Sequence, residues 1–133
     1  MLRQMAIKAQ GQAVPLTMQF DKFWQWLQAH CNCILRAGTP DVVLFDHDDF
    51  HWHLASEDEF TQLLQLVRGK ELVGEIVVLS SEIAYVQCNP PEHDEWVFEC
   101  IVESANAREA AYHFVMAHEF DGDDDSPTRR WTH

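Results

Sequence analysis

Residues 42–69 read VVLFDHDDFHWHLASEDEFTQLLQLVRG, and this stretch decides the fold that the sequence predicts. Two runs of β-forming residues, 42–46 and 50–54, are separated by a short polar segment, which is typical of a β-hairpin. Successive side chains of a strand point to opposite faces, so the second run divides into two sets. We expect its apolar side chains to face the core and His51 and His53 to share the other face.

The second half of the stretch predicts an amphipathic helix. Ser56 and Glu59 form a capping box, in which each side chain can bond the backbone amide of the other residue. The apolar residues then recur at the i, i+3, i+4 and i+7 spacing of one helical face; they are Phe60, Leu63, Leu64 and Val67. Arg68 and Gly69 follow as the cation and the glycine that commonly end a helix.

The order of the remaining elements predicts the fold class. An aromatic-rich helix begins near Thr17, and an alanine-rich helix follows Asn106. Further strands are expected at 33–37, 75–79, 83–88 and 95–103, and the strand at 83–88 is expected to return antiparallel to the strand at 75–79. We therefore predict an α+β domain: a single, mainly antiparallel sheet of about five to six short strands with helices packed largely on one face, in the order α-βββ-α-βββ-α.

The chain is expected to form one domain. Its length of 133 residues suits a single core. We place this domain at residues 17–120, between an N-terminal arm at 1–16 and a C-terminal tail at 121–133. The tail is first acidic and then basic, a composition typical of flexible segments.

The charge is strongly negative and unevenly distributed. The formal net charge is −13, and residues 41–125 hold 21 of the 22 acidic residues. A phosphate backbone is bound by clustered lysine and arginine, so this distribution argues against a nucleic-acid partner. An acidic body favours a basic protein partner through electrostatic steering, although it also serves to keep a protein in solution.

The four cysteines and the N-terminus bear on the compartment. Cys31, Cys33, Cys88 and Cys100 match no secreted disulfide framework, so we expect reduced thiols in a cytoplasmic, bacterial-type protein. The N-terminus lacks the apolar region of a signal peptide, and no apolar run approaches the roughly 20 residues of a membrane span.

The primary functional hypothesis is a non-enzymatic protein-interaction module: a small acidic adaptor, chaperone-like or inhibitor-like protein that binds a basic protein. No nucleophile elbow or phosphate-binding glycine loop indicates catalysis. The order of elements, the size and the acidity are similar to those of small bacterial chaperone and immunity proteins. The expected contact residues are Trp26, Trp52, Asp48, Asp49, Glu57 and Asp58. A homodimer, formed through a sheet edge or the alanine-rich helix, is compatible with this hypothesis.

The alternative hypothesis is a metal-dependent protein, such as a hydrolase or an oxygenase. His51 and His53 on one strand face, with Asp49 at the adjacent turn, would make a two-histidine, one-carboxylate set suited to zinc or iron. The same pair also fits the polar face of an ordinary sheet, so both interpretations of the histidines remain open.

Overall fold

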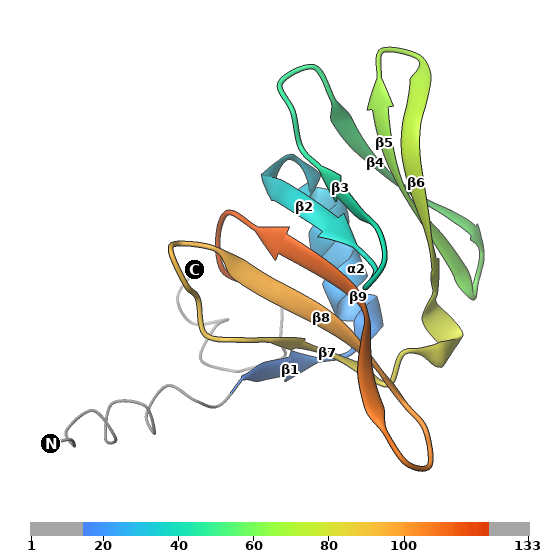
Figure 1. The fold of residues 1–133 in the computed structure, drawn as a ribbon, viewed down its shortest axis with the longest axis vertical. Helices are drawn as coiled ribbons and strands as arrows, with labels where there is room; N and C mark the ends of the chain where they lie inside the picture. The colour runs from blue at the N-terminus through green and yellow to red at the C-terminus, as the bar shows by residue number, and fades with distance from the viewer. Residues whose placement is uncertain (1–14, 123–133) are drawn as a thin grey trace, which may run out of the picture.

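The computed structural model describes residues 15–122 of the chain. In this part, nine strands and one α-helix form two antiparallel sheets, and the helix packs between their inner faces (Figure 1). The six-stranded sheet has the order β1-β7-β8-β9-β2-β3, and the three-stranded sheet has the order β4-β5-β6. The bounds are β1 Leu16–Met18, α2 Phe20–Ala29, β2 Ile34–Gly38, β3 Val43–Phe45, β4 His51–Asp58, β5 Thr61–Arg68, β6 Glu71–Leu79, β7 Tyr85–Cys88, β8 Trp96–Glu103 and β9 Arg108–Met116. Two short 3-10 turns, η1 Cys31–Cys33 and η2 Ser80–Glu82, join α2 to β2 and β6 to β7.

Helix α2 forms where the sequence predicts a helix, and it is buried on more than one side. Phe20, Phe23, Trp24 and Leu27 follow helical spacing and are buried, and Trp26 joins them at 5% exposure. The ring of Phe23 stacks on that of Phe98 of β8, with the ring centroids 5.1 Å apart. It contacts the ring of Phe114 of β9 edge-on, with the centroids 5.3 Å apart. These contacts fix the helix on the six-stranded sheet.

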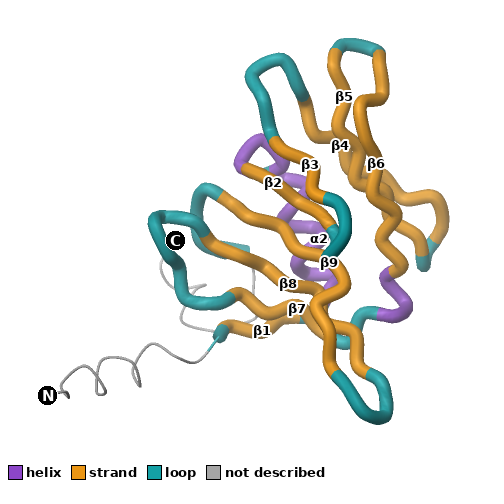
Figure 2. Tube along the Cα trace, in the orientation of Figure 1, coloured by secondary structure: helices purple, strands orange, loops and turns teal. Residues whose placement is uncertain are grey.

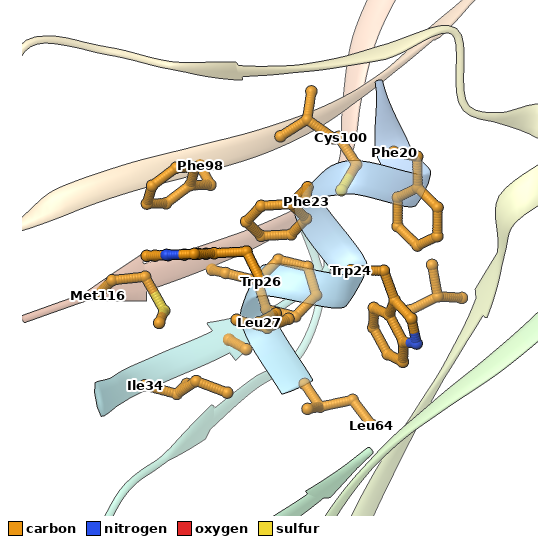
Figure 3. Close-up of a cluster of buried hydrophobic side chains, with 14 of the residues drawn as sticks. Phe20, Phe23, Trp24, Trp26, Leu27, Ile34, Leu64, Phe98, Cys100 and Met116 are labelled. Carbon is orange, nitrogen blue, oxygen red and sulfur yellow. The ribbon is translucent and has the colours of Figure 1, made fainter. Parts of the chain in front are cut away.

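The three-stranded sheet closes the other side of the core. Its inward side chains are Trp52, Leu54, Leu64, Leu66, Ile76 and Val78. Figure 3 shows Trp24 on the side of α2 away from Phe98, with Leu64 near the end of the helix. The two sheets also approach each other directly, because a Cβ atom at Gly74 would lie 2.8 Å from Leu44 Cδ2.

The predicted central helix is wrong, because its residues form the β4–β5 hairpin. On β5 every second side chain is buried, so Leu64 faces the core while Leu63 faces outward. The predicted capping box does not form, because Ser56 lies within β4 and Glu59 lies in the turn. Asp58 Oδ1 accepts a hydrogen bond of 2.8 Å from the Phe60 amide and closes this turn. Pairing with β4 on one side and β6 on the other satisfies the β5 backbone, which outweighs the helical spacing of its leucines.

The predicted last helix is also wrong. Residues 104–107 form a turn, with the Ser104 amide donating to the Ala107 carbonyl at 2.8 Å, and β9 follows. Phe114 and Met116 on β9 alternate into the core, and the strand is hydrogen-bonded between β8 and β2. The fold is therefore a mainly β structure with one α-helix in the described residues, and the predicted α+β architecture of one sheet with several helices does not hold.

Two strand pairings also differ from the prediction. Strands β3 and β4 do not form a hairpin, because β3 is an edge of the six-stranded sheet and β4 belongs to the other sheet. Strand β7 returns to β1 and β8 instead of pairing with β6. Figure 2 shows the loop that carries the chain from β3 across to β4. Each predicted pairing joins two strands that are consecutive in the sequence. The chain instead crosses from one sheet to the other between β3 and β4, and again between β6 and β7.

The predicted arm and tail lie largely outside the described residues. Pro15 leads into β1, which begins at Leu16 and is an edge strand of the six-stranded sheet, and residues 1–14 and 123–133 are not described. Within the described part of the chain, no helix has the length and apolar character needed to cross a bilayer.

Candidate functional site

The β4–β6 outer face, which is the surface of the three-stranded sheet turned away from α2, is the candidate site. Figure 1 shows the three-stranded sheet at the upper right of the molecule. The side chains of the outer face form three rows across the sheet: His51, Val67 and Leu72; His53, Gln65 and Glu75; and Ala55, Leu63 and Val77. These positions alternate with the buried residues of the same strands, so the strand period fixes their outward direction.

The outer face is unusually apolar for a solvent-facing sheet surface. Leu72 is 53% exposed, Val73 44% and Val77 46%, and Leu63 next to Val77 is half-buried. An antiparallel sheet with one solvated face normally carries polar residues there. Neighbouring apolar side chains that face solvent, such as Leu63 and Val77, mark interaction surfaces more often than isolated ones do.

A hydrogen-bonded polar row crosses the middle of this face. Gln65 Nε2 donates to Glu75 Oε2 at 2.7 Å, and Gln65 Oε1 lies 3.0 Å from His53 Nδ1. Because a side-chain amide oxygen only accepts, His53 carries its proton on Nδ1, and in the neutral ring Nε2 keeps its lone pair. The row holds the Glu75 carboxylate in place beside the apolar residues.

The surroundings of the face are acidic. Residues 46–75 contain eight aspartates and glutamates against two cations, Arg68 and Lys70, which leaves a formal charge of −6. One cation is already paired, since Arg68 Nη2 lies 2.8 Å from Glu71 Oε1. This hydrogen bond, followed by the negative charges of Glu71 and Asp49, raises the pKa of Arg68. The potential at the face is therefore negative.

The four acids predicted to contact a partner lie at the two ends of β4. Asp48 and Asp49 are in the loop before it, and Glu57 and Asp58 are its last residues. An eight-residue strand spans roughly 25 Å, so the two pairs are not one cluster. All four are exposed, and they flank the apolar residues at either end.

The two tryptophans predicted as anchors are buried in the core. Trp52 is 6% exposed, and its Nε1 atom donates to the Ile34 carbonyl at 3.1 Å. Trp26 is 5% exposed, and its Nε1 atom donates to Asp121 Oδ1. Neither indole is presented to a partner, so the expectation that they act as surface anchors is not met.

The predicted metal ligands are only partly brought together. His51 and His53 share the exposed face of β4, as the alternation predicts, while Asp49 lies in the preceding loop. Asp49 instead bonds locally, its amide donating to His47 Nδ1 at 3.1 Å. Among residues 15–122, no group of three histidine, cysteine, aspartate or glutamate side chains is arranged to hold a metal ion.

A second polar group lies on the outer face of the six-stranded sheet, and its members are already paired with one another. Arg36 Nη2 bonds Glu95 Oε1 at 2.9 Å, and this hydrogen bond is the main reason that the pKa of Glu95 is lowered. Glu99 Oε1 accepts hydrogen bonds from Gln87 at 3.1 Å and Asn89 at 3.0 Å. These pairings stabilise the surface of the six-stranded sheet.

Sequence reasoning missed the apolar part of the β4–β6 outer face. The helical spacing predicts that Leu63 and Val67 are buried on one side of a helix, but both point outward from β5. Apolar and polar residues do not alternate along residues 61–67, because Leu63 and Leu64 are adjacent, so the pattern gave no signal for this face.

Comparison with known proteins gives no match, since no protein-family model, no curated protein and no solved structure is significantly similar to this chain.

Proposed function

We propose that this protein is a non-enzymatic interaction module, of the adaptor, chaperone or inhibitor type, that binds a basic protein through the β4–β6 outer face. The observation that carries the proposal is the outward-facing apolar row of Ala55, Leu63 and Val77, which lies within an acidic surface. Val77 is 46% exposed, and Ala55 and Leu63 are half-buried. Burial of apolar area would supply the binding free energy, and the carboxylates would select the partner and speed its encounter.

The chemistry of the face also defines the partner. Its apolar residues are flanked by carboxylates at both ends of β4 and by Glu75 within the face. An extended segment whose residues alternate between lysine or arginine and a β-branched apolar residue would match both features, because its two sets of side chains point to opposite faces. The four cysteines are free thiols, which suits action in the cytoplasm.

Chemical-shift mapping tests the proposal with a defined probe. Isotope-labelled protein is titrated with a synthetic peptide of about ten residues in which lysine and valine alternate, long enough to lie along β4 or β6. We expect the largest shifts at the amides of Ala55, Leu63 and Val77, and weaker binding as the salt concentration rises. A peptide of the same length that alternates glutamate and valine is the control and should not bind.

The location of the shifts decides the outcome. Equal shifts at Glu103 and Glu109, which are exposed acids near the β8–β9 turn, would mean that the peptide only follows the overall negative charge. That result, or binding that is indifferent to the charge of the peptide, would contradict the proposal.

A further inference from the structure

Cys33 and His118 are far apart in sequence but are held together by the backbone. Cys33 ends η1, directly before β2, and His118 follows β9, the strand that pairs with β2. The Cys33 amide donates to the His30 carbonyl at 2.9 Å, and the Cys33 carbonyl accepts from the Ala117 amide at 3.0 Å. The position of the thiol relative to His118 is thus set by bonds on both sides of Cys33.

The two side chains form a thiol–imidazole pair. Cys33 Sγ lies 3.1 Å from His118 Nε2, and His118 Nδ1 lies 2.9 Å from the Glu119 carbonyl oxygen. A carbonyl only accepts, so Nδ1 carries the proton of the neutral ring. Nε2 therefore has a lone pair directed at the thiol, which is the arrangement in which an imidazole takes a proton from a nucleophile.

The surroundings of His118 hold its imidazole ring in place. The His118 ring contacts the rings of Trp26 and His30 edge-on, with distances between ring centroids of 5.6 Å and 5.0 Å. The Asp121 carboxylate is close to both histidines. The hydrogen bond from Trp26 is the main cause that lowers the pKa of Asp121, and His30 and His118 lower it further. Asp121 is therefore a carboxylate at neutral pH.

The other three cysteines lack this arrangement. Cys88 and Cys100 are buried, and burial raises the pKa of the Cys88 thiol to about 11. Cys31, two residues before Cys33 and also half-buried, makes no side-chain hydrogen bond within the described part of the chain. Cys31 is thus a matched reference thiol in the same turn.

We propose that Cys33 is a site of reversible S-thiolation, with His118 as its base. His118 Nε2 takes the thiol proton, and the Cys33 thiolate attacks one sulfur of a low-molecular-weight disulfide. The disulfide bond of that molecule breaks as the new bond to Cys33 forms. The departing thiolate then takes the proton from His118, so the products are a mixed disulfide at Cys33 and one free thiol.

The test compares the reaction rates of individual cysteines with two disulfides, 5,5′-dithiobis(2-nitrobenzoic acid) and oxidised glutathione. Peptide mapping by mass spectrometry identifies the residue modified at each time. We expect Cys33 to react about tenfold or more faster than Cys31 near pH 7, since only Cys33 has an imidazole placed to take its proton as the sulfur attacks. Equal rates at the two cysteines in the wild-type protein would overturn the proposal.

Variants separate a base from a purely structural residue. Replacing His118→Gln should slow the modification of Cys33 about tenfold near neutral pH and make its rate rise more steeply with pH, while Cys31 keeps its rate. Cys31→Ser should leave the fast reaction intact, and Cys33→Ser should remove it. An unchanged rate at Cys33 in the His118→Gln variant contradicts the proposal. If that variant is unfolded, Cys88 and Cys100 also react, and the wild-type comparison of Cys33 with Cys31 decides.

Discussion

Trp52 Nε1 donates a hydrogen bond to the Ile34 carbonyl oxygen at 3.1 Å, and this bond joins the two sheets. Trp52 belongs to β4, and Ile34 is the first residue of β2. Both are buried, so each polar atom would be left without a partner if the bond were broken. The hydrogen bond explains why Trp52, which lies between the exposed His51 and His53, points inward and stabilises the core.

Replacing Trp52→Phe should therefore destabilise the protein by more than the loss of the larger ring. Trp24 supplies the matched control, because it is also 6% exposed but its Nε1 atom has no hydrogen-bond partner in the described part of the chain. Trp24→Phe removes a similar volume without orphaning a carbonyl. We expect the free energies of unfolding of the two variants, measured in urea, to differ by about 1–3 kcal/mol, with Trp52→Phe the less stable. Equal values would contradict the structural role of the bond.

Two neighbouring leucines distinguish the strand from the helix that the sequence predicts. In a helix, Leu63 and Leu64 would lie on one buried face; on β5, only Leu64 is fully buried. Leu64→Ala should lower the free energy of unfolding by about 2–5 kcal/mol, the range for a buried leucine, and Leu63→Ala by clearly less. Denaturant unfolding of both variants gives the comparison. Similar large losses would favour the helix.

The sequence predicts the local features of this fold better than its architecture. The helix around Phe23, several strands and the alternation of His51 and His53 are all found as predicted, because each depends on a short-range pattern. Residues 60–67 have the apolar spacing of a helix, but their state is decided by the pairing of β5 with β4 and β6. That pairing is a tertiary property that the pattern does not contain.

The candidate sites show the same limit. The outward positions of β4 could be derived from its alternation, but the apolar row needs β5 and β6 in register, which places Leu63 opposite Val77. Cys33 and His118 are 85 residues apart and meet only because β2 pairs with β9. No spacing rule along the chain identifies such a pair.

The lowered pKa of His113 predicts that the folded protein becomes less stable in mild acid. His113 lies on β9 opposite Glu99, and its pKa is lowered below 6.5 by burial and then by the charge of Arg36, with Glu99 acting in the opposite direction. The unfolded chain therefore binds the proton more readily, and this contribution to stability is lost as the pH falls from about 6.5 through the folded-state value. We expect His113→Gln to reduce the difference in unfolding free energy between about pH 7.5 and pH 5.5.

The pKa of His113 can also be measured directly. Histidine ring signals followed by NMR against pH should give a midpoint below 6.5 for His113 in the folded protein. A midpoint at or above that value would contradict the burial and the proximity to Arg36 seen in the structure.

The most direct test of the proposed function is the affinity of the lysine–valine peptide for two variants of equal charge. Val77→Lys places a cation in the apolar row of the β4–β6 outer face, whereas Val43→Lys places one on β3, an edge strand of the other sheet. Both valines are exposed, at 46% and 37%, so neither substitution empties the core. Calorimetric titration should show that Val77→Lys weakens binding by about tenfold or more, through lost apolar contact and like-charge repulsion, and that Val43→Lys binds as the wild type does. Equal weakening by the two variants would mean that net charge alone attracts the peptide, and the β4–β6 outer face would not be the binding site.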